Sequence, residues 1–530
     1  MADDRRVMTT QHNDAEPSTD LTHRQRTIII LGLMTGLMLA ALDSTIVSAA
    51  LRTIVGEFGG IDHLSWVFTA YLVASATSMP LFGKISDLYG RKKVYQTAIV
   101  IFLIASAMCG AAQNLGQLIA FRTIQGIGGG GLFTLTFTIV GDIVPPRERG
   151  RYTGYLSGTF ALASVLGPLV GGFLTDEFSW RWVFYVNLPI GAAAFVVTGI
   201  VLKIQPRKAE HSLDLAGSAL LVTAIVSSLL ATVWATEQYG WGAPQTIGLY
   251  ALAVVALAAF ILEERRADEP VLPLRMFSRT GYTAASIVSL LAGAAMYGAI
   301  VYLPLFFQGV QGKAAANAGL LLLPLMVSMM FASLISGRLT TRTGHYRIYP
   351  MIGTPLAAFG LYLLSTMGPD TGRALSSLWM TVLGAGIGIA LPVLTLAVQN
   401  TVEFRDLGAG TASVNFFRTI GGTFGLAVFG TVLSRQLDSN LDTNLTGIEV
   451  PTGIETADLA QSPTAISQLG EPLKGAVTTA LSDSITTTFF FATFVMVAAF
   501  IAAAFMREVA LRTTTDAQSG TVSTLSQEPA

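Results

Sequence analysis

Three ionisable side chains lie inside segments that are otherwise apolar. Asp43 lies in the apolar run Thr27–Val47, and Arg122 and Arg418 lie in later runs of the same kind. A charged side chain in the middle of a bilayer costs roughly 2.5–3.5 kcal/mol on insertion scales. Charged residues that are kept in a bilayer at this cost are expected to take part in the function of the protein. A carboxyl group that moves between a buried site and the vicinity of a cation can take up and release a proton.

Asp43 and Arg122 are expected at similar depths. Asp43 follows the start of its run by about 16 residues, or roughly 24 Å of helix. Arg122 enters its own run from the opposite side by about seven residues, or roughly 10 Å. Pairing would lower the cost of burying both charges. Three hypotheses remain open: a proton carrier, a permanent ion pair that fixes helix packing, or a binding site for a cationic drug.

Arg418 is predicted near the middle of its span, and Asn415 lies three residues before it. Residues three apart share one helical face, so both are expected to line a polar cavity. Two roles are left open for this pair: contact with the substrate, or hydrogen bonding between helices. Tyr297, Phe306 and Met326 are candidates for an adaptable apolar lining, with lipid-facing positions as the alternative.

The composition indicates a protein embedded in a lipid bilayer. Of the 530 residues, 52% are hydrophobic and 12% charged, against roughly 25% charged in soluble domains. The net charge of −1 argues against a nucleic-acid partner. No phosphate-binding loop, metal-ligand cluster or catalytic constellation is found, so we expect neither an enzyme nor a bound cofactor or metal. We expect a monomer.

Fourteen apolar runs are long enough to cross a bilayer, which needs about 20 residues per helix. If both chain ends are cytoplasmic, 24 of the 32 Lys and Arg residues fall on the inner side and six on the outer side. This bias predicts a multi-pass protein of the plasma membrane with both termini in the cytoplasm.

Two pairs of connecting segments suggest an internal repeat. The stretch Gly83–Gly90 resembles Gly337–Gly344, 254 residues later, and the segment ending at Gly154 resembles the one ending at Gly410. Repeats of this kind are common in transporters. The first offset spans eight predicted helices rather than six, which places two extra helices between two six-helix bundles.

The predicted organisation has five parts. In chain order they are a cytoplasmic tail (1–26), a six-helix bundle (27–205), two inserted spans (206–265), a second six-helix bundle with a long extracellular loop at 434–482 (266–507), and a disordered cytoplasmic tail (508–530).

Several motifs resemble those of the major facilitator superfamily, and of its fourteen-helix drug:proton antiporters in particular. The residues in question are LFGKISDLYGRKK from Leu81, LDSTIVSAAL from Leu42, RTIQGIGGG from Arg122, GPLVGG from Gly167 and WRWVFYVNLPIG from Trp180. Their order and spacing together are typical of that branch. The resemblance implies an all-α major facilitator fold with fourteen spans.

The resemblance also implies roles for individual residues. It links Asp43 and Arg122 to proton coupling. It makes Gly83, Asp87, Gly90 and Arg91 a loop that holds the two bundles together, and it ties Gly167, Pro168, Gly171 and Gly172 to antiport. Independently, a carboxylate such as Asp87 is favoured near the start of a neighbouring helix.

The predicted function is proton-coupled export of drug-like, apolar or cationic compounds by alternating access, with protons as the coupling ion. The alternatives are an exporter dedicated to one physiological compound, such as an antibiotic, siderophore or lipid precursor, and a channel or membrane receptor. Asp43 and the loop at Gly83–Arg91 argue against a channel.

Overall fold

The computed structural model describes residues 23–58, 64–202, 214–237, 239–313, 320–445, 466 and 469–511. Parts of the predicted organisation lie outside these residues. They are most of the first tail, the boundary at 203–213, the centre of the 434–482 loop and most of the tail that follows residue 507.

The described residues form helices and connecting turns, with no β-strand among them. The α-helices are α1 (His23–Phe58), α2 (Leu64–Tyr89), α3 (Arg91–Gly110), α4 (Leu115–Ile143), α5 (Pro146–Glu177), α6 (Trp182–Tyr185), α7 (Asn187–Val201), α8 (Leu215–Glu237), α9 (Pro244–Glu264), α10 (Thr280–Leu305), α12 (Leu323–Thr343), α13 (Ile348–Leu364), α14 (Arg373–Thr401), α15 (Leu407–Asn444) and α18 (Leu473–Ala504). Short helical turns are η2 (Leu274–Ser278), η3 (Phe306–Val310) and η4 (Phe404–Asp406).

Within this described part, thirteen helical segments are long and apolar enough to cross a membrane, with α6 and α7 counted together. The shorter apolar helix α13 has 17 residues, or about 25 Å, which is close to the thickness of a hydrocarbon core. The predicted all-α membrane fold is confirmed.

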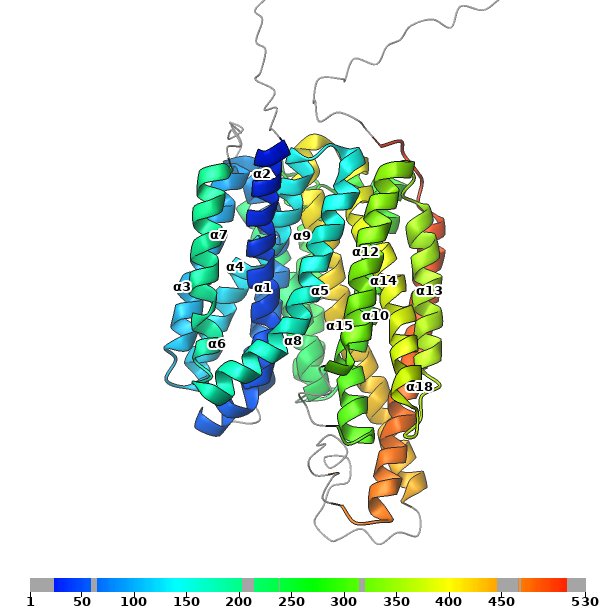
Figure 1. Ribbon diagram of the computed structural model, residues 1–530. Coiled ribbons are helices and arrows are strands. Elements are labelled where there is room, and N and C mark those ends of the chain that lie inside the picture. The colour runs from blue at the N-terminus through cyan, green and yellow to red at the C-terminus, as the bar shows by residue number, and fades with distance from the viewer. Residues whose placement is uncertain are drawn as a thin grey trace, which may run out of the picture.

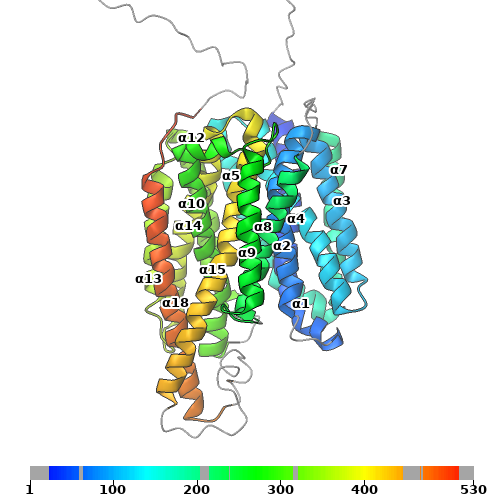
Figure 2. The same ribbon diagram turned by 180° about the vertical axis from the view of Figure 1, so that it is seen from behind.

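The helices are arranged as two bundles with an inserted pair (Figures 1 and 2). α1 to α7 pack together around their own apolar cores, and α10 to α18 form the second bundle. α8 packs against both α2 and α15, and Figure 2 shows α8 and α9 beside the boundary between these helices. The inserted pair therefore covers one side of the junction between the bundles.

The described chain begins and ends on the same face, which we call the terminal face (Figure 1). This face carries the start of α1, the α2–α3 turn at Gly90 and the start of α15 at Leu407. The other end of the molecule is called the opposite face. Two further contacts tie the segment after α9 to α2 and the inserted pair to α15. Lys84 Nζ lies 2.5 Å from Glu269 Oε2, and Trp241 Nε1 donates to Thr431 Oγ1 at 3.0 Å.

The prediction of a long loop at residues 434–482 is wrong at both of its ends, where the structure has helix. α15 continues to Asn444 and α18 begins at Leu473, and the two helices project together beyond the opposite face (Figure 1). The projecting part of α15 is too polar to be read as a span. Leu437 and Leu441 are nevertheless buried four residues apart, which is the spacing of one helical face, so this segment folds as an amphipathic helix.

Candidate functional site

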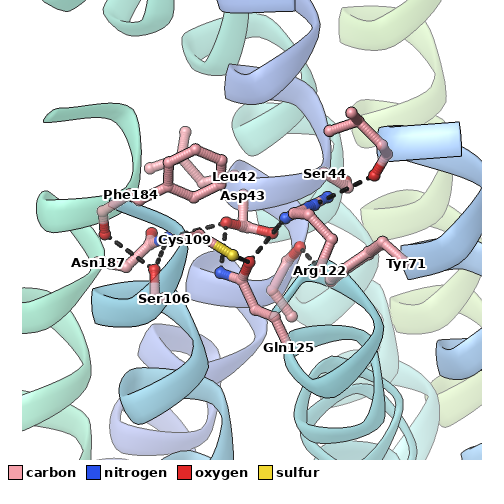
Figure 3. A network of polar contacts seen from close by, with 12 residues as sticks. Leu42, Asp43, Ser44, Tyr71, Ser106, Cys109, Arg122, Gln125, Phe184 and Asn187 are labelled. Carbon is pink, nitrogen blue, oxygen red and sulfur yellow. Dashed lines mark hydrogen bonds and ion pairs between the residues drawn. The ribbon is translucent and has the colours of Figure 1, made fainter. Parts of the chain in front are cut away.

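Asp43 of α1 is held by side chains from two other helices of the first bundle, α4 and α7 (Figure 3). Its side chain is 0% exposed. Arg122 Nη1 of α4 lies 2.6 Å from Asp43 Oδ2. Asp43 Oδ1 accepts hydrogen bonds from Gln125 Nε2 at 2.8 Å and from Asn187 Nδ2 at 2.9 Å. The structure thus brings Asp43 and Arg122 together and gives the carboxylate two amide donors.

Arg122 is equally enclosed. It is 0% exposed, and its Nη1 also donates to Gln125 Oε1 at 2.9 Å. Its guanidinium carbon lies 4.2 Å from the centroid of the Tyr71 ring, a distance at which the ring face attracts a cation. Nη2 has no hydrogen-bond partner among the described residues. Asp43 is therefore the neighbour that balances this charge, and protonation of Asp43 would leave a buried cation without a counter-charge.

Gln125 and Asn187 are not among the residues predicted from the sequence. Gln125 follows Arg122 by three residues, so the two share a helical face, and an amide within an apolar run was an available signal. Asn187 lies in the motif that begins at Trp180. Its contact with Asp43 depends on how α7 packs against α1, which no local pattern specifies.

We expect Asn187→Leu to lower the free energy of unfolding by about 2–3 kcal/mol, because hydrogen bonds to charged groups contribute about 1.5–3 kcal/mol. Asn187 Nδ2 also donates to Ser106 Oγ at 3.0 Å. The measurement is the thermal unfolding midpoint of the purified protein. Asn440→Leu is the control, since Asn440 makes a neutral bond to Ser484 Oγ at 3.0 Å, worth about 1 kcal/mol. Equal effects of the two variants would contradict the prediction.

The motif that begins at Gly167 packs α5 against α1 beside Asp43. A Cβ at Gly167 would overlap the side chain of Thr45, two residues after Asp43. Pro168 lies inside α5, and Gly171 is buried. Gly172 has open space around its Cα, so close packing does not explain this fourth residue. The first three residues fit a tight, bent contact between the two helices.

The motif that begins at Trp180 makes contacts in two places. Its first residues bind Glu57 near the opposite face, and Asn187 binds Asp43. Trp180 Nε1 donates to Glu57 Oε2 at 2.6 Å, and Arg181 Nη2 lies 2.8 Å from Glu57 Oε1. The Arg181 guanidinium, together with the Trp180 indole, holds the pKa of Glu57 below its usual range. These contacts fix the start of α6, and Asn187 follows at the start of α7.

The loop predicted at Gly83–Arg91 is wrong in its secondary structure, because α2 continues to Tyr89 and α3 begins at Arg91, with Gly90 alone between them. Its charged residues form a cluster on the terminal face. Arg91 Nη2 lies 2.5 Å from Asp87 Oδ1, and Arg91 Nε donates to Asp142 Oδ2 of α4 at 2.6 Å. Gly90 has a backbone φ of 93°, a conformation that residues other than glycine rarely adopt. The structure therefore places Asp87, Gly90 and Arg91 where α2, α3 and α4 meet.

Asp87 also contacts the second bundle. Its Oδ2 accepts the backbone N–H of Ala409 at 3.2 Å, in the first turn of α15. Carboxylates are stabilised at helix N-termini by the unpaired N–H groups and the helix dipole. The expectation that Asp87 lies at the start of a neighbouring helix is met. Gly83 permits this approach, because a Cβ there would lie 2.5 Å from Ala412 Cβ.

A second contact between the bundles joins α5 and α12. Gly150 and Gly337 face each other so closely that a Cβ on either would overlap the other's carbonyl oxygen. Gly154 lies in the same way against the backbone of Ser333. Nearer the centre, Gln399 Nε2 of α14 donates to the carbonyl oxygen of Phe137 at 3.1 Å. These contacts lie towards the terminal face, which is therefore closed.

Arg418 lies in α15 at the boundary between the bundles. Its Nη2 donates to Asn415 Oδ1 at 2.9 Å, and its guanidinium carbon lies 5.0 Å from the Phe133 ring centroid of α4. The structure thus brings the predicted pair together. Tyr297 packs against Gly422, one turn beyond Arg418. Phe306 and Met326, in contrast, are 0% and 3% exposed in the apolar core of the second bundle, so core packing accounts for both of them.

The model of the Major Facilitator Superfamily matches residues 33–426. The multidrug transporter protein MdtP of Bacillus subtilis is 37% identical over 457 residues, covering 86% of this chain and 82% of that protein. Multidrug resistance protein 3 of Bacillus subtilis is 36% identical over 496 residues, covering 92% of this chain and 96% of that protein.

Solved structures share the fold. The proton:xylose symporter XylE superposes with a TM-score of 0.62 at 14% identity, over 92% of this chain and 97% of that one. The human organic anion transporter MFSD10 superposes with a TM-score of 0.60 at 13% identity, over 91% of this chain and all of that one. At these identities the similarity concerns the architecture alone.

Proposed function

Because the chain belongs to the major facilitator superfamily, we propose that it exports drug-like compounds across the plasma membrane in exchange for protons. Export is supported by the relatives named multidrug transporters. Proton coupling is supported by the buried pair of Asp43 and Arg122, which is the observation that carries this proposal. The bias of Lys and Arg supports a terminal face directed to the cytoplasm.

The proposed coupling starts from the charge balance at Asp43. While Asp43 is ionised, it compensates Arg122. When a proton arrives, the pair loses its attraction and Arg122 becomes a buried, uncompensated cation, a state that costs several kcal/mol. Arg122 must then move towards water or another acceptor. Since Asp43 is 0% exposed here, proton exchange belongs to a second conformation in which water reaches the carboxylate.

The helix α4 connects this pair to the closed face. Arg122 and Asp142 are both on α4, 20 residues or about 30 Å apart, and Asp142 accepts from Arg91 at 2.6 Å. A Cβ at Gly126 or Gly130 would overlap backbone atoms of α2. α4 and α2 therefore move together, and a displacement of Arg122 is transmitted to the contact between Asp87 and α15.

The proposal is tested with purified protein in liposomes that have an acidic interior. Dyes of different charge, such as ethidium, Nile red and fluorescein, are offered outside, and accumulation is followed by fluorescence. One pH unit supplies about 1.36 kcal/mol per proton, or about tenfold accumulation of a dye exchanged for one proton. We expect accumulation that disappears when an ionophore removes the gradient. Accumulation that is independent of the gradient would refute proton exchange, and a steady current without dye would favour a channel.

A further inference from the structure

Arg418 differs from three buried cations of the first bundle. Arg122 contacts Asp43, Arg91 contacts two carboxylates, and Lys84 contacts Glu269. Arg418, the twelfth residue of α15, lies about 17 Å from the helix start, near the middle of a bilayer. No carboxylate lies within 4 Å of its guanidinium among the residues that the structure describes.

The neighbours of Arg418 satisfy only part of its hydrogen-bonding capacity. A guanidinium has five N–H donors and no acceptor. One of them, on Nη2, donates to Asn415 Oδ1 at 2.9 Å. The ring of Phe133 faces the guanidinium carbon at 5.0 Å and cannot neutralise its charge. A planar group with unused donors is suited to bind a carboxylate through two parallel hydrogen bonds.

The surroundings of Arg418 are aromatic and partly open. Phe133 of α4, Phe160 of α5 and Tyr297 of α10 are all half-buried in the middle of their helices, as is Arg418 itself. The rings of Phe133 and Phe160 are edge to face, with centroids 6.1 Å apart. These side chains come from both bundles. They could pack around the apolar body of a compound whose charged end reaches the guanidinium.

Arg418 lies just beyond the contacts that close the terminal face. Phe137, whose carbonyl oxygen accepts from Gln399, is one turn nearer to that face than Phe133 on α4. Thr419 Oγ1 contacts Met79 Sδ of the first bundle at 3.9 Å. The Thr419–Met79 contact is thus at the level of Arg418, whereas the Gln399–Phe137 contact lies nearer to the terminal face. From Arg418 the path away from the Gln399–Phe137 contact leads to the opposite face, where a compound would leave the protein.

We propose that Arg418 binds the carboxylate, or another anionic group, of the transported compound, with Phe133, Phe160 and Tyr297 around its apolar part. This inference rests on the proposed export function and narrows its substrate class to amphipathic organic acids. It replaces the cationic compounds expected from the family resemblance. Export of an anion is also favoured by a membrane potential that is negative inside.

The experiment compares three dansyl compounds of similar size: dansylglycine, which is anionic, dansylglycinamide, which is neutral, and dansyl-ethylenediamine, which is cationic. Binding to the purified full-length protein in nanodiscs is followed by dansyl fluorescence, without a proton gradient. We expect dansylglycine to bind about 10-fold to 100-fold more tightly than the amide, the factor for hydrogen bonds to a charged group. We expect Arg418→Gln to remove this preference and leave amide binding within about twofold.

Two further variants separate the charge from its position. Arg418→Lys should retain part of the preference, because the charge remains while the planar pair of donors is lost. Arg435→Gln, which removes an exposed cation from the same helix, should bind like the wild type. Unchanged binding of the amide shows that Arg418→Gln is folded.

The proposal is overturned by equal affinities for the three compounds, by tighter binding of the cation, by the absence of saturable dansylglycine binding, or by an unchanged preference in Arg418→Gln. Loss of amide binding in both Arg418 variants would also overturn it, by assigning Arg418 to helix packing. A binding preference without gradient-driven transport would refute proton exchange and leave this inference intact.

Discussion

Asp43→Asn is expected to abolish accumulation driven by a pH gradient, with a loss of about 100-fold or more. Asparagine cannot carry the proton, and Arg122 loses the partner that lies 2.6 Å from it. Removing one member of a buried pair typically costs about 3–5 kcal/mol. The measurement is initial dye uptake into liposomes with an acidic interior, with Asp438→Asn, an exposed carboxylate on α15, as the control.

A double variant separates coupling from stability. Asp43→Asn combined with Arg122→Gln removes both charges, so its thermal midpoint should recover towards the wild-type value. If Asp43 carries the proton, this variant still exchanges labelled for unlabelled dye across the membrane and no longer concentrates it. If the pair only fixes helix packing, the stabilised variant should concentrate dye as well. Full gradient-driven accumulation in Asp43→Asn would refute the proton-carrier role.

Gly337→Leu is expected to open the terminal face and to reduce transport by about 10-fold to 100-fold. The added side chain has no room beside Gly150. Inserting extra carbon atoms into a packed contact costs about 1–3 kcal/mol, and each 1.4 kcal/mol shifts a two-state population by about tenfold. The closed state would thus lose most of its population while each bundle remains folded.

The shift is measured as the distance between spin labels on Tyr89→Cys and Arg342→Cys. Both residues are exposed on the terminal face, at the ends of α2 and α12. The single native cysteine, Cys109, is buried and is replaced by alanine. We expect a longer distance in Gly337→Leu and no change in the control Gly248→Leu, whose Cα has open space on α9. An unchanged distance would mean that this contact does not keep the face closed.

The internal repeat explains why the terminal face is closed in two places. Gly83 of α2 meets Gly408 of α15, and Gly337 of α12 meets Gly150 of α5. The offset of 254 residues relates Gly83 to Gly337, and similar segments contain their partners. Although the repeat was predictable, the pairing across bundles was not, because a repeat defines equivalent positions and not which of them touch.

The two closures are not equivalent in charge. Asp87 and Arg91 reinforce the contact of α2 with α15. The residues 254 positions later are Thr341 and His345, so the same pair of opposite charges is absent from the repeat. The two closures therefore depend on different interactions.

The predictable parts of the Asp43 site were those that depend on depth in the membrane. Counting residues placed Asp43 and Arg122 at one level, because helices rise by a constant amount per residue. The rotation of each helix about its axis decides whether two side chains face each other. This rotation is set by packing over the whole bundle, and for that reason Asn187 was not found.

The prediction from hydropathy was also wrong where a helix continues beyond the membrane. The end of α15 alternates buried leucines with polar residues, and such a segment scores like a loop in any measure of average apolarity. Phe306 and Met326 illustrate the converse error. Aromatic and sulfur-containing side chains suit a binding surface and a core equally well, and their burial decided between the two.

The inserted pair makes the two lateral sides of the molecule unequal. α8 lies against α2 and α15, whereas none of the described helices covers the junction of α5 and α12 in Figure 1. A lipophilic compound dissolved in the bilayer therefore meets the inserted pair on one side of the molecule and the packed junction of α5 and α12 on the other. The two sides of the molecule thus present different surfaces to the surrounding lipid.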